Sequence, residues 1–292
     1  MVLTRLFIVA VTALIGASGI AAAAEATDLL LVLAADASRS LDYQKFQLQR
    51  DGYAAAMSDP RVIEAIRSGP HGRIAVSFVE WSGFGAQKLV IDWTVISDLA
   101  SARAFGDRLR DAPRSFADRT SISGGIDFAA RQFDHAAFDA GRRVIDVSGD
   151  GTNNAGRDVE LARNDAVAKG ITINGLVILS ERPIPWNPEH TNPPGGLAEY
   201  YRNHVIGGPG AFVMVAEDFK SFGRALTSKL VAEIAQTAPP QRAALALPAG
   251  RARSPGVAAA LAAAPSLFPE AIQNVTGQFV FIPDWNHSKS LI

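Results

Sequence analysis

Hydroxyl and carboxylate side chains alternate directly after an apolar run near the start of the chain. The run Leu29–Ala35 is followed by Asp36, Ser38 and Ser40 in an Asp-x-Ser-x-Ser pattern. Oxygen ligands of this kind suit hard divalent cations such as Mg²⁺, Mn²⁺ or Ca²⁺, and they do not select zinc or copper. A cation site is one interpretation of this loop. In the other, Ser38 and Ser40 only cap the helix that follows.

Two later segments carry matching polar residues. The apolar strand Arg143–Ser148 ends in Gly149-Asp150-Gly151, and Thr120 lies in a polar loop that leads into a helical pattern. Taken alone, Thr120 could be a helix cap and Asp150 a turn residue. Ligands of open α/β sheets bind at the carboxyl ends of the strands, so the order and strand context of these residues favour one shared metal site.

This set of residues resembles the metal-ion-dependent adhesion site (MIDAS) of the von Willebrand factor A-like domain. The resemblance covers roughly residues 28–236, and the segment Leu48–Ala56 is similar to an uncharacterised secreted bacterial branch of that superfamily. The resemblance implies that Ser38, Ser40 and Thr120 coordinate Mg²⁺, with Mn²⁺ or Ca²⁺ as alternatives. It also implies that Asp36 and Asp150 act through water.

In that superfamily an Asp or Glu of a partner protein completes the coordination of the ion. The resemblance therefore implies a cation-dependent docking domain with an acidic protein partner, and not an enzyme. The motif segments contain no histidine or carboxylate placed to activate water, and Glu80 and Asp146 are the nearest candidates for a base. A metal-dependent phosphate or ester hydrolase and a degenerate scaffold without metal stay as alternatives.

Composition excludes several other classes of protein. The 292 residues carry a net charge of -1, which gives no electrostatic argument for nucleic acid or anionic membranes. The chain has no cysteine, so zinc-thiolate sites, iron–sulfur clusters, cysteine nucleophiles and disulfides are excluded. A chain that is 48 % hydrophobic and 20 % charged suits one globular domain with room for tails.

The two ends of the chain differ from its middle. Residues 1–24 contain Arg5, an apolar stretch and Ala22-Ala23-Ala24, as in a secretory signal peptide cleaved before Glu25. This predicts a periplasmic or secreted protein without a later membrane span, the alternative being an uncleaved anchor. Residues 25–236 form the predicted domain. Residues 237–292 begin with an Ala-, Pro-, Gly- and Arg-rich stretch and are predicted to be disordered or loosely docked.

Hydrophobic periodicity predicts alternating strands and helices between these ends. The predicted strands are Leu29–Ala35, Arg73–Trp81, Gln87–Val95, Arg143–Ser148, Ile171–Leu179 and Phe212–Ala216. The predicted helices are Leu41–Met57, Val62–Ile66, one ending at Leu109, Gly125–Phe133, Asn153–Ala168, Leu197–Val205 and Phe219–Ile234. Because only one pair of strands forms a hairpin, we expect a doubly wound α/β fold, mostly parallel with one antiparallel edge strand.

A few other residues could contribute to a site. The five histidines show no metal-ligand spacing and are predicted to lie on the surface or in loops. Trp81 and Phe84 either line the rim of the metal site or pack in a turn. Trp186 lies in a long proline-rich loop, which predicts a recognition surface. Gly124-Gly125 predicts a flexible loop beside Thr120.

Overall fold

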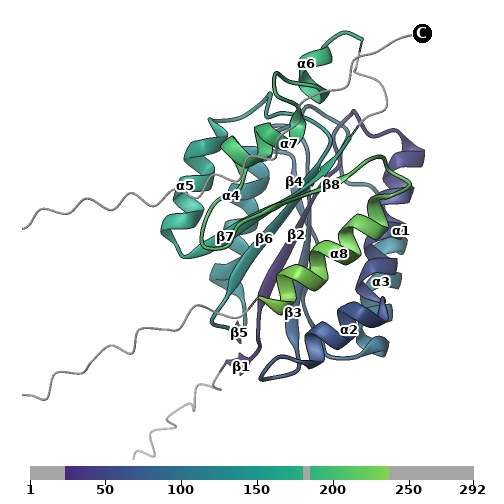
Figure 1. The fold of residues 1–292 in the computed structure, drawn as a ribbon, viewed down its shortest axis with the longest axis vertical. Coiled ribbons are helices and arrows are strands. Elements are labelled where there is room, and N and C mark those ends of the chain that lie inside the picture. The colour runs from purple at the N-terminus through teal and green to yellow at the C-terminus, as the bar shows by residue number, and fades with distance from the viewer. Residues whose placement is uncertain (1–23, 180–184, 237–292) are drawn as a thin grey trace, which may run out of the picture. The chain divides into compact units, whose positions relative to one another are not determined.

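Strands and helices alternate to build a six-stranded sheet that carries helices on both faces (Figure 1). The computed structural model describes residues 24–179 and 185–236. The strand order is β4-β3-β2-β6-β7-β8, and only β3 and β4 pair in antiparallel fashion. This confirms the predicted doubly wound fold. The strands are β2 (Leu30–Asp36), β3 (Ile74–Trp81), β4 (Gln87–Ile96), β6 (Arg143–Gly149), β7 (Ile171–Ile178) and β8 (Val213–Ala216).

The helices form two layers, each with its own apolar core (Figure 1). One face is covered by α1 (Tyr43–Met57), α2 (Pro60–Arg67), α3 (Leu99–Asp111) and α8 (Phe222–Ala235). The other face carries α4 (Ile122–Gln132), α5 (Val159–Ala168) and α7 (Leu197–Tyr200), and the short α6 (Pro188–Thr191) lies beyond α7. Along β2, Leu31 and Leu33 point into the first core and Leu30 and Val32 into the second, which explains its unbroken apolar sequence.

The chain reverses its direction of sheet growth between β2 and β6. From β2 it crosses to β3 and β4 on one side, then returns to the opposite side to add β6, β7 and β8. The two strands lie side by side in parallel, with Leu30 opposite Arg143 and Ala35 opposite Ser148. Their carboxyl ends therefore meet at the topological switch point, where open α/β sheets bind ligands.

The structure corrects several predicted boundaries. The helix predicted from Asn153 begins at Val159, because Asp158 caps it and residues 150–158 form a loop. The terminal helix begins at Phe222 instead of Phe219. The helix predicted to run to Val205 continues as a π-helical turn over Tyr201–Val205. Four short elements were not predicted: the paired strands β1 (Glu25–Ala26) and β5 (Phe138–Asp139), a 3₁₀ turn at Phe133–His135, and α6, which lies within the predicted proline-rich loop.

Gly124 and Gly125 do not form a flexible loop. Both lie inside α4, which Ser121 caps by accepting a hydrogen bond from the Gly124 amide at 3.2 Å. A Cβ on Gly125 would lie 2.7 Å from Cγ of Trp81, so the absent side chain lets α4 pack directly on the indole. The prediction of flexibility was wrong, because glycine here serves close packing rather than a turn.

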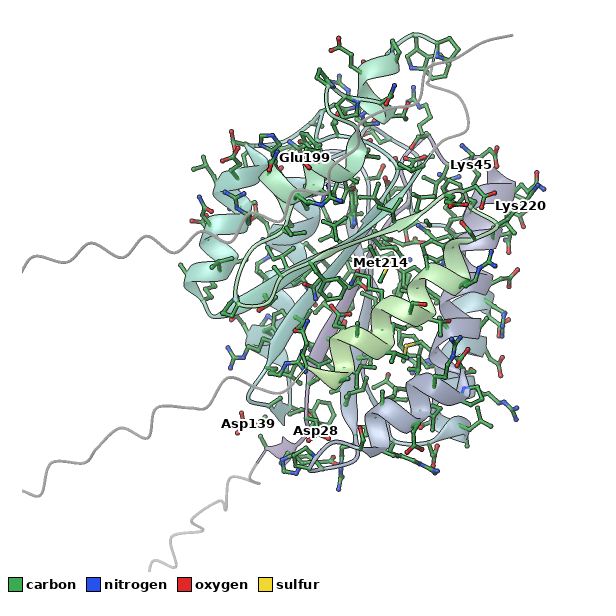
Figure 2. The ribbon with its side chains drawn as sticks, viewed as in Figure 1. Asp28, Lys45, Asp139, Glu199, Met214 and Lys220 are labelled. Atoms are coloured by element: carbon green, nitrogen blue, oxygen red, sulfur yellow. The ribbon has the colours of Figure 1, made fainter. Side chains whose placement is uncertain are left out.

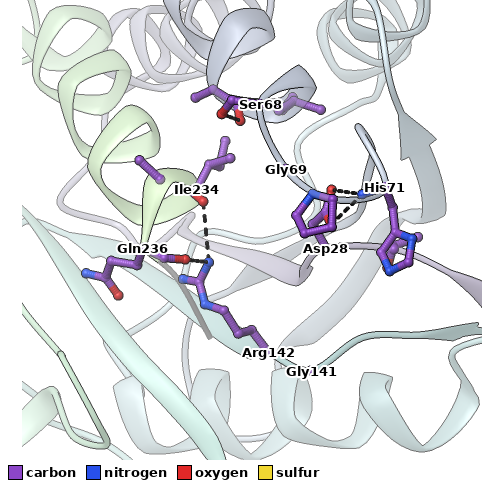
Figure 3. A pocket seen from close by; sticks show the side chains of 13 residues that line it. Asp28, Ser68, Gly69, His71, Gly141, Arg142, Ile234 and Gln236 are labelled. Carbon is purple, nitrogen blue, oxygen red and sulfur yellow. Dashed lines mark hydrogen bonds between the residues drawn. The ribbon is translucent and has the colours of Figure 1, made fainter. Parts of the chain in front are cut away.

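The amino end of the sheet holds a pocket of about 440 Å³ (Figure 3). Arg142 spans its floor and donates to the carbonyls of Glu233 (2.6 Å), Ile234 (3.4 Å) and Gln236 (2.6 Å), which end α8. Asp28 accepts from the amide of His71 at 2.9 Å. These polar groups are already paired with backbone groups. The Arg142 side chain therefore serves to hold the carboxyl end of α8 in place.

No helix within residues 24–179 and 185–236 is long and apolar enough to cross a membrane. The predicted leader, apart from Ala24, and the predicted tail lie outside the described residues. The boundaries of residues 25–236 as a domain thus stay a prediction.

Replacing Arg142 by Ala should destabilise the domain by about 1–3 kcal/mol, because carbonyls at the end of α8 lose their charged donor. Urea unfolding would measure this change. Arg143→Ala is the matched control, since Arg143 is exposed and surface substitutions usually change stability by less than about 0.5 kcal/mol. Equal unfolding midpoints for the two variants would contradict the fastening role of Arg142.

Candidate metal centre

Four of the five predicted site residues form one chain of hydrogen bonds. The Ser38 amide donates to Oδ1 of Asp36 at 2.7 Å, directly after β2. The hydroxyls of Ser38 and Ser40 lie 2.9 Å apart, and Ser40 Oγ donates to Oδ1 of Asp150 at 2.6 Å. The end of β2 is thereby joined to the end of β6, as the sequence predicted.

Thr120, the fifth predicted residue, reaches the site through the loop that precedes α4. Its amide donates to Asn154 Oδ1 at 3.0 Å, and its carbonyl accepts from the Asn154 amide at 2.9 Å. Asn154 belongs to the loop after β6, so Thr120 is fixed to the same loop that carries Asp150. Thr120 and Ser40 both line a cavity of about 120 Å³. The structure therefore brings all five predicted residues to one edge of the sheet.

Both carboxylates of the site are buried and incompletely paired. Asp36 and Asp150 are each 0 % exposed, and the Oδ2 atom of each has no hydrogen-bond partner among the described residues. Burial, and then the charge of Asp150, raises the pKa of Asp36 to about 8. Burial also raises the pKa of Asp150, although the Ser40 hydroxyl and Lys45 act in the opposite direction. Two such groups need a cation or a proton between them.

A third unpaired group lies beside these carboxylates. The buried hydroxyl of Tyr201 has no hydrogen-bond partner among the described residues. A Cβ on Gly149 would lie 2.5 Å from this hydroxyl and 3.3 Å from Asp36 Oδ2, so both atoms border the same space. Burial raises the pKa of Tyr201, and the charges of Asp36 and Asp150 raise it further. Because the phenol stays protonated, it can donate to Asp36 or to a water at the site.

The donor set fits a hard divalent ion. No group of three or more His, Cys, Asp or Glu side chains suited to a metal occurs in the part of the chain that the structure describes. The site instead offers three hydroxyls and two carboxylates. Hydroxyl and carboxylate oxygens suit Mg²⁺, Mn²⁺ and Ca²⁺. The unpaired Oδ2 atoms of Asp36 and Asp150 are the positions at which positive charge, direct or through water, would relieve the burial of both carboxylates.

A cationic clamp holds the loop that carries the serines. Arg114 Nη2 donates to the carbonyls of Ala37 at 2.9 Å and Ser38 at 2.7 Å. Its guanidinium stacks over Phe46 in α1, 5.3 Å from the ring centroid. The neighbouring Ser115 amide donates to Glu80 at 3.0 Å. The loop's conformation is thus set by residues 76 or more positions later in the chain.

Glu80 and Asp146, the two candidates for a catalytic base, are both neutralised elsewhere. Glu80 forms a buried ion pair with Arg50 at 2.5 Å. Asp146 forms one with Lys229 at 2.7 Å, where both side chains are 0 % exposed. Burial raises the pKa of Asp146 to about 7, and Lys229 acts in the opposite direction. Both carboxylates serve the packing of helices on the sheet, so neither is free to act on a ligand.

His190 is the site residue that sequence reasoning missed. It is 5 % exposed, so the prediction of a surface or loop position was wrong about its burial. Its Nε2 lies 3.2 Å from Thr120 Oγ1, and its Nδ1 lies 3.2 Å from Thr152 Oγ1. The ring packs directly against Gly151. A Cβ at this position would overlap Cε1 and Nε2 of the ring, so only glycine leaves room for it. Burial lowers the pKa of His190, which keeps the imidazole neutral beside Thr120.

The two aromatic residues near the end of β3 have different roles. Trp81 is fully buried and donates from Nε1 to the Ala34 carbonyl at 3.0 Å, so it supports β2 from within the core. Phe84 is 81 % exposed and borders a hollow that Arg119 also lines. Of these two aromatic residues, Phe84 is therefore the one that borders a surface hollow beside the site.

The site occupies the end of the molecule opposite the Arg142 pocket. Figure 2 shows Lys45 at one end and Asp28 and Asp139 at the other. Lys45 Nζ donates to the Ser40 carbonyl at 3.5 Å. The candidate metal centre therefore lies at the same end of the molecule as Lys45.

Solved structures with a similar fold include those of two proteins. Proximal thread matrix protein 1 from the mussel byssus matches with a TM-score of 0.51 and 15% identity, over 73% of this chain and 49% of that chain. A second structure of it, with a zinc-occupied MIDAS motif, matches with a TM-score of 0.50 and 16% identity, over 72% and 48%. The pilus adhesin SpaC from Lactobacillus rhamnosus GG matches with a TM-score of 0.52 and 11% identity, over 71% and 30%.

At these identities the likeness shows the fold, which is of the von Willebrand factor A type. This chain spans less than half of the length of each of those proteins. Among curated proteins, none matches this sequence. One family model, described as a protein of unknown function (DUF1194), matches residues 26–238, and the chain accordingly belongs to the DUF1194 family.

Proposed function

We propose that this protein is a secreted or periplasmic domain that binds a protein partner through a divalent cation. Ser38, Ser40 and Thr120 would hold the ion, and Asp36 and Asp150 would balance its charge. The observation that carries this proposal is the pair of buried carboxylates, each with an unpaired oxygen, beside three hydroxyls at the switch point of the sheet. The zinc-occupied MIDAS of a mussel protein with a similar fold supports it.

The chemistry of the donors favours docking over catalysis. Hydroxyl ligands are neutral, so an ion held by them keeps positive charge and keeps positions open for outside ligands. An Asp or Glu side chain of a partner would fill such a position. Mg²⁺ is the proposed ion, with Mn²⁺ or Ca²⁺ as alternatives of the same ligand preference.

None of three candidate bases for the hydrolase alternative, Glu80, Asp146 and His190, is free. Glu80 and Asp146 are held by Arg50 and Lys229. Both ring nitrogens of His190 face polar partners of the protein, so the imidazole is occupied in fixing Thr120. A turnover screen with phosphate and ester substrates tests this alternative, and metal-dependent turnover would favour it.

The first expected outcome is saturable binding of Mg²⁺ and Mn²⁺ to the full chain, with a higher melting temperature than in chelator. Ser38→Ala and Asp150→Asn should each weaken metal binding by about ten-fold or more, because each removes a donor or a charge at the ion. Isothermal titration calorimetry and thermal melting would measure both effects.

Ser228→Ala is the matched control for this experiment, since Ser228 is exposed on α8 and bonds only to the Arg224 carbonyl in the described part of the chain. It should bind metal as the unchanged protein does. Folded protein that shows no binding at millimolar Mg²⁺ and Mn²⁺ would contradict the proposal and favour a scaffold without metal.

Metal affinity should fall as the pH is lowered from 8 to 6. The pKa of Asp36 in the metal-free protein is raised to about 8, so at neutral pH this carboxyl holds a proton that the metal must displace. Affinity should therefore drop by about ten-fold per pH unit below that pKa and level off above it. Calorimetry in two buffers of different ionisation enthalpy should detect about one proton released per ion. Binding without proton release would contradict the burial of this carboxylate pair.

A further inference from the structure

Exposed aromatic side chains gather near the candidate metal centre. Five large apolar side chains are exposed in residues 24–179 and 185–236, and the two most exposed are Phe84 at 81% and Trp186 at 82%. Trp186 lines the same small cavity as Ser40 and Thr120. Phe84 lines a second hollow of about 320 Å³, which shares Asp118 and Arg119 with the first. The two rings thus border two adjoining hollows beside the site.

Two arginines line these hollows, and neither has a side-chain partner in residues 24–179 and 185–236. Arg39 and Arg119 are exposed, and neither guanidinium has a hydrogen bond or ion pair among the described residues. Arg39 follows Ser38, and Arg119 precedes Thr120, so each is adjacent in sequence to a proposed metal ligand. Among the described residues that line the hollows, Asp118 is the one acidic residue, and its carboxylate lies over Gly83. The rim therefore carries an excess of positive charge.

Arginine and aromatic residues are the types enriched where protein interfaces hold most of their binding energy. A lone carboxylate on the metal would leave both guanidiniums and both rings unused. A second carboxylate can form paired, charge-assisted hydrogen bonds with arginine, which lysine cannot match geometrically. The surface is thus complementary to a ligand with more than one acidic group.

We propose that this surface binds an extended segment of another protein that carries two acidic side chains flanked by apolar residues. One carboxylate completes the coordination of the ion, and the second pairs with Arg39 and Arg119. The apolar neighbours pack on Phe84 and Trp186. This inference rests on the proposed metal-dependent function and specifies the partner that the site selects.

The test uses the full chain, saturated with Mg²⁺, and blocked synthetic peptides built from Leu, Gly and Asp. One peptide carries a single Asp, and a series carries two Asp residues separated by one to four glycines. The best two-Asp peptide should bind about ten-fold more tightly than the single-Asp peptide in calorimetry. The double variant Arg39→Ala/Arg119→Ala should abolish this advantage and still bind Mg²⁺.

Arg103→Ala is the matched control, because Arg103 is an exposed arginine on α3 and lines neither hollow. It should retain the ten-fold preference. Phe84→Ala and Trp186→Ala should each weaken the binding of every peptide that contains leucine. They should not change the binding of matched peptides in which glycine replaces every leucine. That pattern would support the apolar part of the proposal, and equal losses for both peptide sets would overturn it.

The outcomes separate this inference from the function on which it rests. If Mg²⁺ binds and both peptide classes bind equally, the two-acid preference is overturned and the metal-dependent function stands. If the metal alone does not bind, the proposed function fails first. Polygalacturonate, a carbohydrate polymer with many carboxylates, is a further probe. If it binds more tightly than the peptides and its binding requires Arg39 and Arg119, the proposal of a protein partner is overturned. If the chain self-associates and Arg39→Ala/Arg119→Ala abolishes this self-association, the surface binds a second copy of the chain. That result would overturn the proposal of a segment from another protein.

Discussion

The candidate site depends on two carboxylates that the fold buries at the ends of neighbouring strands. Asp36 and Asp150 are brought together because β2 and β6 pair in parallel and end at the same edge. The Ser38 amide donates to Asp36, the Ser40 hydroxyl donates to Asp150, and each carboxylate keeps one oxygen without a partner in the described residues. Burying such charge is costly unless a counter-charge is present. The remaining features of this edge can be understood as the means of holding that arrangement in place.

The residues that hold this arrangement in place come from several elements that are far apart in the sequence. Arg114 holds the carbonyls of the serine loop, and it is itself stacked on Phe46 of α1. Asn154 holds Thr120 against the loop after β6. Trp81 supports β2 from inside, and the absence of a side chain at Gly125 lets α4 approach it. A site made of short side chains on three loops is rigid only because long side chains from other elements restrain those loops.

The sequence predicted the sheet, and it predicted which five residues meet at the carboxyl edge of that sheet, because both follow from local patterns. Apolar runs mark buried strands, and Asp36, Ser38 and Ser40 follow one of them directly. His190 and Arg114 had no such signal, since their roles arise from contacts across 70 and 76 residues of sequence. The start of α5 was misplaced because Asn153 and Asn154 bond to the Thr120 segment rather than begin a helix. Tertiary contacts overrode local propensity at both places.

The Gly149-Asp150-Gly151 segment has a consequence for how the chain acquires this site. Tyr201 lies against the first glycine and His190 against the second, so both neighbours of Asp150 pack against a segment that is synthesised well after it. A ribosome that has made only the first 151 residues has already made every proposed ligand, but neither of the rings that pack against the glycines beside Asp150. The residues of the proposed metal site therefore depend on a later segment of the chain for their surroundings. Grafting these residues onto another sheet without the segment that carries His190 and Tyr201 would transfer the oxygens and leave behind the dry surroundings that give them their unusual proton affinity.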